Sequence, residues 1–149
     1  MGIRFLHRET GGDTAREALE RRFQTYFPRA FAYAVSNVGD EEQVRGLVTE
    51  AFGRIFSASP QMPEEQFRIA LFSALSELCR TQPRPVPVDF GLSQRERSAV
   101  TLTFDAGLSV AEAGRVAGAE NLAADLERAL RKLQAGASPA TVPNFFQAP

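Results

Sequence analysis

Few residues of this chain have side chains that could do acid–base, nucleophilic or metal chemistry. His7 is the only histidine and Cys79 the only cysteine, so the sequence offers neither an internal disulfide nor a His/Cys zinc cluster. His7 lies near the N-terminus, where we expect a mobile segment that cannot hold a catalytic triad. The sequence contains no glycine-rich phosphate loop and no nucleophile elbow. We therefore expect no enzyme activity, no catalytic residue, and no bound metal or cofactor.

The residues with binding chemistry are the cations, and almost all of them are arginine. Lys132 is the only lysine among 17 basic residues. A GC-rich genome would produce the same bias, although arginine is also the better fork of N–H donors for carboxylates and phosphates. The net charge is -1, however, whereas a dedicated DNA-binding domain usually carries a basic excess on one face. Any DNA contact must therefore depend on a local group of cations.

Helical periodicity indicates which elements position these residues. Apolar residues recur at the 3.6-residue spacing of a helix, and no alternating pattern is long enough for a strand, so we expect an all-α fold. Residues 14–80 should form a first lobe of four helices. The first of these is interrupted or restarted at Pro28, and the other three carry inward stripes over residues 27–38, 44–56 and 67–78.

Glycine and proline mark the ends of these helices. Gly39 is placed to close one helix in a left-handed conformation, and the segment 40–43, Asp to Gln, resembles a capping box for the next. Residues 81–91 contain a proline run that predicts a stiff linker. Residues 135–149 are rich in alanine, proline and serine and read as a tail, although the pair at 145–146, Phe-Phe, could pack back onto a lobe.

Residues 92–134 should form a second, three-helix lobe. Two Ser-x-x-Glu capping boxes, at 93–96 and 109–112, announce its first two helices, and Gly107 and Gly118 are natural helix stops. The buried stripe of the last helix is predicted to consist of Leu122, Leu126, Ala129, Leu130 and Leu133. A helix, a glycine stop, a short capped helix, a glycine turn and a longer helix together are typical of a helix-turn-helix motif, although three-helix bundles that do not bind DNA share this spacing.

The helix-turn-helix interpretation selects five residues that could reach DNA. They are Arg115, Asn121, Arg128, Arg131 and Lys132. The segment 109–133 contains four basic residues and also four acidic residues, which are Glu112, Glu120, Asp125 and Glu127. Its net charge is therefore zero. The three cations near the end of the last helix also complement its dipole, which is an alternative to DNA contact. DNA binding through this lobe is therefore an open prediction.

The order of these motifs resembles the extracytoplasmic-function (ECF) type of sigma-70 family sigma factors. Residues 38–52 resemble sigma region 2, whose pattern reads roughly G-D-x-x-x-A-E-D-L-V-Q-E-x-F, and residues 67–72 resemble its F-x-x-W-L-x helix. Residues 92–97 resemble the L-P-x-x-x-R opening of region 4, and residues 107–112 resemble its G-x-S-x-x-E step. The resemblance implies a region 2-like lobe followed by a region 4-like helix-turn-helix lobe.

The resemblance also implies a binding surface. In ECF sigma factors the helix that holds D-L-V-Q-E grips the coiled coil of the largest RNA polymerase subunit. If the corresponding residues of this chain play the same roles, Leu47 and Val48 should face the core of the lobe. Arg45, Thr49 and Glu50 are then placed to contact a partner. For Glu50, a solvated carboxylate on a helix face is an equally good interpretation.

Several departures from the family pattern weaken the expectation of DNA contact. Gly46 replaces the family's acidic residue, Thr49 replaces its glutamine, and Ala70 replaces its tryptophan. The proline run at 83–87 stands where the family has an arginine-rich stretch that helps to open the promoter. The linker is also shorter than the linker that lets family members span two promoter elements.

We expect a cytoplasmic, sigma-factor-like transcription regulator that binds the RNA polymerase core, with promoter DNA as a further candidate partner. Neither a membrane-spanning segment nor a signal peptide is expected. One alternative is a degenerate sigma mimic or adaptor that works through protein contacts, for example with an anti-sigma factor. Another is a simple helix-turn-helix repressor that dimerises through its first lobe. Whether the lobes pack together is left open, and packing could hide a polymerase-binding surface.

Overall fold

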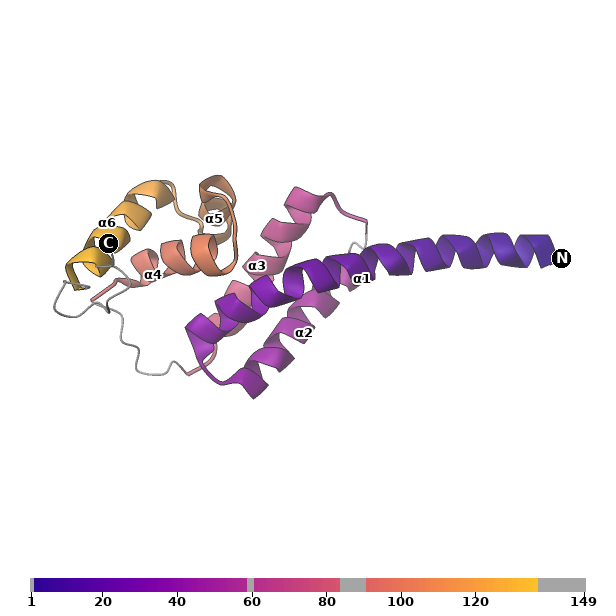
Figure 1. Ribbon diagram of the computed structural model, residues 1–149, viewed down its shortest axis with the longest axis horizontal. Coiled ribbons are helices and arrows are strands. Elements are labelled where there is room, and N and C mark those ends of the chain that lie inside the picture. The colour runs from indigo at the N-terminus through magenta and orange to yellow at the C-terminus, as the bar shows by residue number, and fades with distance from the viewer. Residues whose placement is uncertain (1, 59–60, 84–90, 137–149) are drawn as a thin grey trace, which may run out of the picture.

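The computed structural model describes residues 2–58, 61–83 and 91–136, with side chains described from residue 15 onward. Within these residues the chain is all-α, as the periodicity predicted, with six α-helices, one π-helical turn and no strand. In chain order the elements are α1 (Gly2–Val38), α2 (Glu41–Ala58), α3 (Glu64–Arg80), α4 (Gln94–Val100), η1 (Thr101–Asp105), α5 (Val110–Ala117) and α6 (Leu122–Gly136), as Figure 1 shows.

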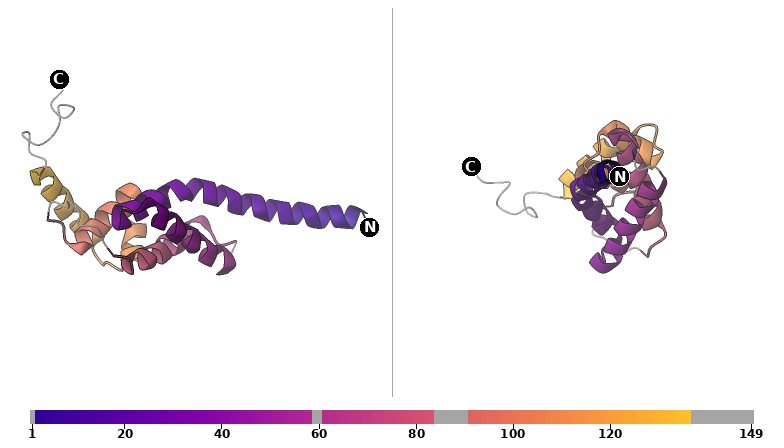
Figure 2. Two further views of the ribbon diagram at one scale, coloured as in Figure 1. Left: turned by 90° about the horizontal axis from the view of Figure 1, so that it is seen from below. Right: turned by 90° about the vertical axis from the view of Figure 1, so that its right-hand side faces the viewer.

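α1 runs through Pro28 without a break, so the predicted interruption is wrong. The described part of the first lobe therefore has three helices instead of four. Proline removes one backbone donor from a helix interior. Pro28 lies on the exposed side of α1, however, while its neighbours Tyr26 and Ala30 are buried, and this burial holds the flanking turns against one core. α1 also includes Gly11 and Gly12, which were expected in an irregular lead, and its N-terminal turns project from the body (Figure 2).

The first lobe buries the predicted stripes of α2 and α3 against α1. Its large, fully buried side chains include Val44, Val48, Phe67, Leu71, Phe72 and Leu75. The ring of Phe52 lies 4.8 Å from that of Phe23 and 6.2 Å from that of Phe67, measured between centroids. Complete burial of a side chain of this size stabilises a fold by about 1.5–3 kcal/mol. The core therefore fixes α2 with its opposite side facing solvent.

The junction between α1 and α2 follows the predicted signals in part. Gly39 adopts a φ of 93°, in the left-handed region that favours glycine, and its N–H donates to Val35 O. Asp40 Oδ1 accepts from the Glu42 backbone N–H at 3.0 Å, which caps α2. The side chain of Gln43 does not complete the expected capping box, because it donates to Gln82 at the end of the first lobe.

The second lobe has both predicted capping boxes. The Ser93 side chain accepts from the Glu96 N–H, Ser109 accepts from the Glu112 N–H, and each glutamate accepts in return from the backbone N–H of its serine. The predicted glycine stops adopt left-handed backbone conformations, with φ of 72° at Gly107 and 66° at Gly118.

The stripe predicted for α6 is correct at Leu122 and Ala129, which are buried, and wrong at Leu130, which is 42% exposed. Leu126 and Leu133 are half-buried. α6 contacts mainly α4 within a small lobe, so its buried face is narrower than the apolar stripe of the sequence. A 15-residue helix can present an exposed leucine without a structural consequence.

The two lobes pack together. α3 packs against α5, α1 packs against η1, and buried residues of both lobes form one continuous core. α2 packs on α1 and α3 and lies away from α4, α5 and α6 in Figure 1. Packing of the lobes therefore leaves the outer side of α2 uncovered.

Two sequence expectations fall outside the described residues. They are the proline-rich part of the linker, residues 84–90, and the tail with its pair of phenylalanines at 145–146. Among the described helices, none combines the length and apolar character needed to span a membrane.

Candidate functional site

The first candidate site is the solvent side of α2. Arg45, Thr49 and Glu50 are all exposed there, opposite the buried Val44 and Val48. At 100° per residue, the three side chains lie on one side of the helix. Glu50 accepts from Arg54 Nη2 at 3.1 Å in an exposed pair, which contributes little stability.

The centre of this surface is formed by glycine. Gly46 and Gly53 lie one heptad apart on the same exposed side of α2, and a Cβ at either position would meet nothing within 4 Å. The helix backbone is therefore open to close approach at the position where the family pattern has an acidic side chain. We call Arg45, Gly46, Thr49, Glu50 and Gly53 the α2 face.

The second candidate site is the second lobe, where the predicted DNA-binding residues lie on α5, on α6 and in the turn between them. Asn121 precedes α6, and its Oδ1 accepts from the Ala124 backbone N–H at 3.2 Å. It therefore caps α6. Glu120 is exposed in the same turn and places a negative charge beside this helix start.

Arg128 and Lys132 of α6 are engaged with buried carboxylates. Lys132 Nζ donates to Glu96 Oε1 at 2.7 Å, and Arg128 Nε lies 3.6 Å from Glu96 Oε2. Arg128 also pairs with Asp125, which is 1% exposed. The hydrogen bond from Lys132, helped by the backbone N–H of Ser93, lowers the pKa of Glu96 to about 2. Both cations therefore balance charge inside the lobe.

The other two predicted cations are also paired. Arg115 Nη1 of α5 donates to Glu65 Oε1 of α3 at 3.0 Å, and Arg131 Nη2 donates to Glu127 Oε1 at 2.5 Å. Both pairs are exposed, so a phosphate could compete for these guanidinium groups at modest cost. Of the four cations predicted to contact DNA, two are thus held weakly and two balance buried carboxylates of the lobe.

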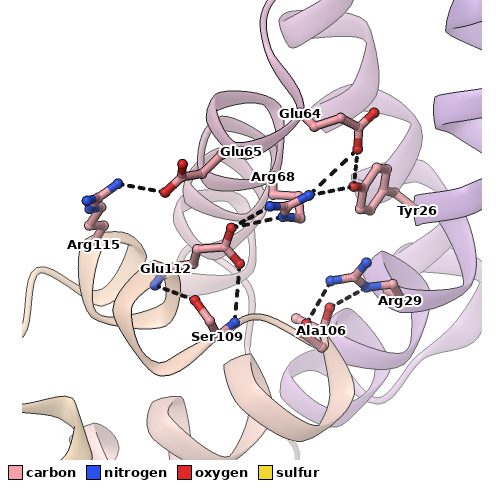
Figure 3. Close-up of polar contacts among 10 residues, drawn as sticks. Tyr26, Arg29, Glu64, Glu65, Arg68, Ala106, Ser109, Glu112 and Arg115 are labelled. Atoms are coloured by element: carbon pink, nitrogen blue, oxygen red, sulfur yellow. Dashed lines mark hydrogen bonds and ion pairs between the residues drawn. The ribbon is translucent and has the colours of Figure 1, made fainter.

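The contacts between the lobes centre on Arg68 of α3. As Figure 3 shows, Arg68 Nε and Nη2 donate to Glu112 Oε2 at 3.0 and 2.7 Å, and Nη1 donates to Tyr26 Oη at 3.1 Å. Glu112 also closes the capping box of α5, so this carboxylate serves both its own helix and the opposite lobe. The bonds from Arg68 lower the pKa of Glu112, and the same contact with Glu112 raises the pKa of Arg68.

Tyr26 extends this network within the first lobe. Its hydroxyl donates to Glu64 Oε2 at 2.5 Å, and Arg22 Nε donates to Glu64 Oε1 at 3.2 Å. Burial raises the pKa of Tyr26, and the bond that it donates lowers the pKa of Glu64. The polar groups at the lobe boundary therefore form one connected chain from α1 through α3 to α5.

Arg29 of α1 makes the other main contact between the lobes. Its Nε donates to Ala106 O at 2.6 Å, and its Nη2 donates to Gly107 O at 2.9 Å, which satisfies carbonyls at the end of η1 (Figure 3). The guanidinium lies 4.9 Å from the ring centroid of Tyr26. We call Arg29, Arg68, Ala106, Gly107 and Glu112 the lobe interface.

Sequence reasoning found only part of the lobe interface. It identified Glu112 through its capping box and Gly107 as a helix stop. It missed Arg29 and Arg68, because their partners lie 77 and 44 positions away along the chain. An arginine at the edge of an apolar stripe is a weak signal of such a contact, and it does not identify the partner.

Cys79 and His7, the residues with catalytic potential, lie on different helices. Cys79 is buried in the core of the first lobe, as expected for a packed thiol. His7 lies within α1 and not in an irregular lead. In the part of the chain that the structure describes, His, Cys, Asp and Glu side chains form no group of three or more that could hold a metal ion.

Searches against protein-family models, curated proteins and solved structures found no match to this chain.

Proposed function

We propose that this chain is a sigma-factor-like transcription regulator that binds the RNA polymerase core through the α2 face. The supporting observation is that Arg45, Thr49 and Glu50 are exposed on a rigidly packed helix even though the lobes are closed. They stand at the positions that correspond to the polymerase-binding helix of the ECF sigma factors that the sequence resembles.

The chemistry of the α2 face suits a helical partner. Gly46 and Gly53 allow close backbone approach, and Arg45 and Glu50 offer charges of both signs around them. Complementary charges at an interface orient the partners and favour the correct register. A partner helix with opposite charges at matching positions would bury these glycines at the centre of the contact.

Direct binding to purified RNA polymerase core tests this proposal. A double charge reversal, Arg45→Glu with Glu50→Lys, should weaken binding by at least tenfold, or about 1.4 kcal/mol. Glu77→Lys on the exposed side of α3 changes charge outside the α2 face and should leave binding unchanged. Absence of wild-type binding at micromolar concentration, with or without DNA, would contradict the proposal.

A second candidate function is an adaptor that acts through protein contacts, for example with an anti-sigma factor, without reading a promoter. It is supported by the four cations that were predicted to contact DNA, which all pair with carboxylates of the chain itself. DNA affinity depends on cations that are available to phosphates, and it falls steeply with salt in proportion to their number. Strong, salt-sensitive binding to promoter DNA would count against the adaptor and in favour of a promoter-reading regulator.

A further inference from the structure

A polar cavity of about 610 Å³ lies between the lobes, away from the α2 face. One wall is the end of α3, with Ser76 and Arg80, and another is α4, with Arg95 and Ser98. Leu102, Val116 and Leu122 form its apolar floor. The volume lies in the range of small-molecule sites and exceeds what a single inorganic anion fills.

Arg95 is held at this cavity by a buried carboxylate. Its Nη2 lies 3.4 Å from Asp125 Oδ2, and Asp125 is 1% exposed. Asp125 Oδ2 has no hydrogen-bond partner among the described residues. The contact between Arg95 and Asp125 is therefore an ion pair without a hydrogen bond, and no N–H group of Arg95 is used by this oxygen. Asp125 thus holds the guanidinium in place while leaving it able to donate into the cavity.

The charge around the cavity favours an anion. Arg95 and Asp125 line the cavity, and Arg128, Lys132 and Glu96 adjoin them; these three cations exceed the two carboxylates by one positive charge. Arg80 at the end of α3 adds a second, and it forms no ion pair within the described part of the chain. Glu120 at the rim subtracts one.

We propose that this cavity binds a small phosphorylated molecule, with the phosphoryl group held between Arg80 and Arg95. Guanidinium groups bind phosphate oxygens through charge-assisted hydrogen bonds. Ser76 and Ser98 supply hydroxyl donors from the same two walls. The remaining space takes the non-phosphate part of the molecule against the apolar floor. Because the two walls belong to different lobes, the bound molecule stabilises their packed arrangement.

Thermal unfolding with defined probes tests this site. Pyrophosphate and adenosine 5′-monophosphate, each at a hundredfold excess over its Kd, should raise the Tm by about 5–10 °C. Adenosine, and sodium chloride at matched ionic strength, should not. Equal shifts with adenosine or chloride, or no shift and no calorimetric binding at millimolar concentration, would overturn the proposal.

Three variants and one control connect the binding to the cavity. Arg80→Gln and Ser76→Asp should weaken binding of adenosine 5′-monophosphate about tenfold or more, while Glu120→Gln should strengthen it, because it removes the one rim charge that repels the anion. Arg21→Gln on the exposed part of α1 is the control and should bind like the wild type. Each variant should keep the Tm of the unliganded protein, because none of these side chains is buried. Wild-type binding in Arg80→Gln would show that the anion lies elsewhere and would overturn the proposal.

Discussion

At the scale of single residues, Arg29 and Gly107 depend on each other. A Cβ at Gly107 would lie 3.0 Å from Arg29 Nε and 3.2 Å from its Nη2. The residue also adopts a φ of 72°, which side chains rarely accept. Glycine at this position therefore permits both the turn after η1 and the approach of the guanidinium to the carbonyls that it satisfies.

Substitution of Gly107 tests this dependence against a matched position. Gly118 has a similar φ of 66°, but a Cβ there would meet nothing within 4 Å. Gly118→Ala should cost about 1–2 kcal/mol of unfolding free energy from backbone strain alone. Gly107→Ala should cost about 1–3 kcal/mol more, because it also displaces a charged hydrogen-bond donor. Urea denaturation measures both, and equal losses would show that Arg29 adapts without cost.

Glu96 should make stability depend on pH in the acid range. The pKa of Glu96 is lowered from 4.5 to about 2, chiefly by the hydrogen bond from Lys132. As the pH falls, the carboxylate of Glu96 is therefore protonated in the unfolded chain before it is protonated in the folded chain. The stabilisation is fully present above about pH 4.5 and is lost as the pH falls toward 2. Glu96→Gln keeps the capping geometry but removes the charge, so its stability should be lower at pH 6 and flatter between pH 5 and 2.

Denaturant unfolding across this pH range checks the effect, with Glu127→Gln as the comparison. Glu127 forms an exposed pair with Arg131, so its substitution should leave the acid-range slope close to that of the wild type. If Glu96→Gln keeps the wild-type slope, the ion pair with Lys132 does not contribute to folding.

At the scale of elements, the continuity of α1 through Pro28 is the main departure from expectation. The helix keeps its path because residues on both sides of the proline are buried in the same core, although one backbone hydrogen bond is lost. Local propensity is weaker here than tertiary packing. The proline is thus a position where the chain can gain stability.

Pro28→Ala should therefore raise the unfolding free energy by about 1–3 kcal/mol, because it restores a helix donor and a residue of high helix propensity. Pro63→Ala is the matched control. Pro63 precedes α3 with a φ of -58°, which proline accepts without strain, so its replacement should be neutral or lower stability by up to about 1 kcal/mol. A destabilised Pro28→Ala variant would indicate that α1 is broken at this position.

At the scale of the whole molecule, the lobes share one core and one polar network, so they should unfold as a unit. Arg68 and Glu112 connect them through a partly buried ion pair with side chains 25% and 10% exposed. Removing one partner leaves the other charge without its counterpart. The closed arrangement is thus part of the fold.

A double-mutant cycle with Arg68→Gln and Glu112→Gln should give a coupling energy of about 1–3 kcal/mol, measured by denaturant unfolding. The same cycle on Arg54 and Glu50, an exposed pair within α2, should give about 0.5 kcal/mol or less. Two separate unfolding transitions in the wild type would show that the lobes are independent and that this pair does not hold them together.

The sequence by itself indicated the helices from α2 onward and several of their ends, but not the continuity of α1 through Pro28. Apolar spacing marked the inward faces of α2 and α3, and the serines at 93 and 109 marked the starts of α4 and α5. These signals are local, because helix hydrogen bonds and caps join residues only three or four positions apart.

Only the tertiary structure decided how the lobes meet and which cations remain available. Lys132 is a potential phosphate contact in the sequence, whereas in the fold it balances Glu96, 36 positions away. Arg68 carried only a weak signal that did not identify its partner, yet it bridges the lobes to Glu112. Arg45, Thr49 and Glu50 were expected at a partner-facing surface because of the family resemblance, but only the packing of α3 against α5 shows that the second lobe leaves this surface uncovered. Such pairings depend on contacts between distant parts of the chain, and helical periodicity carries no information about them.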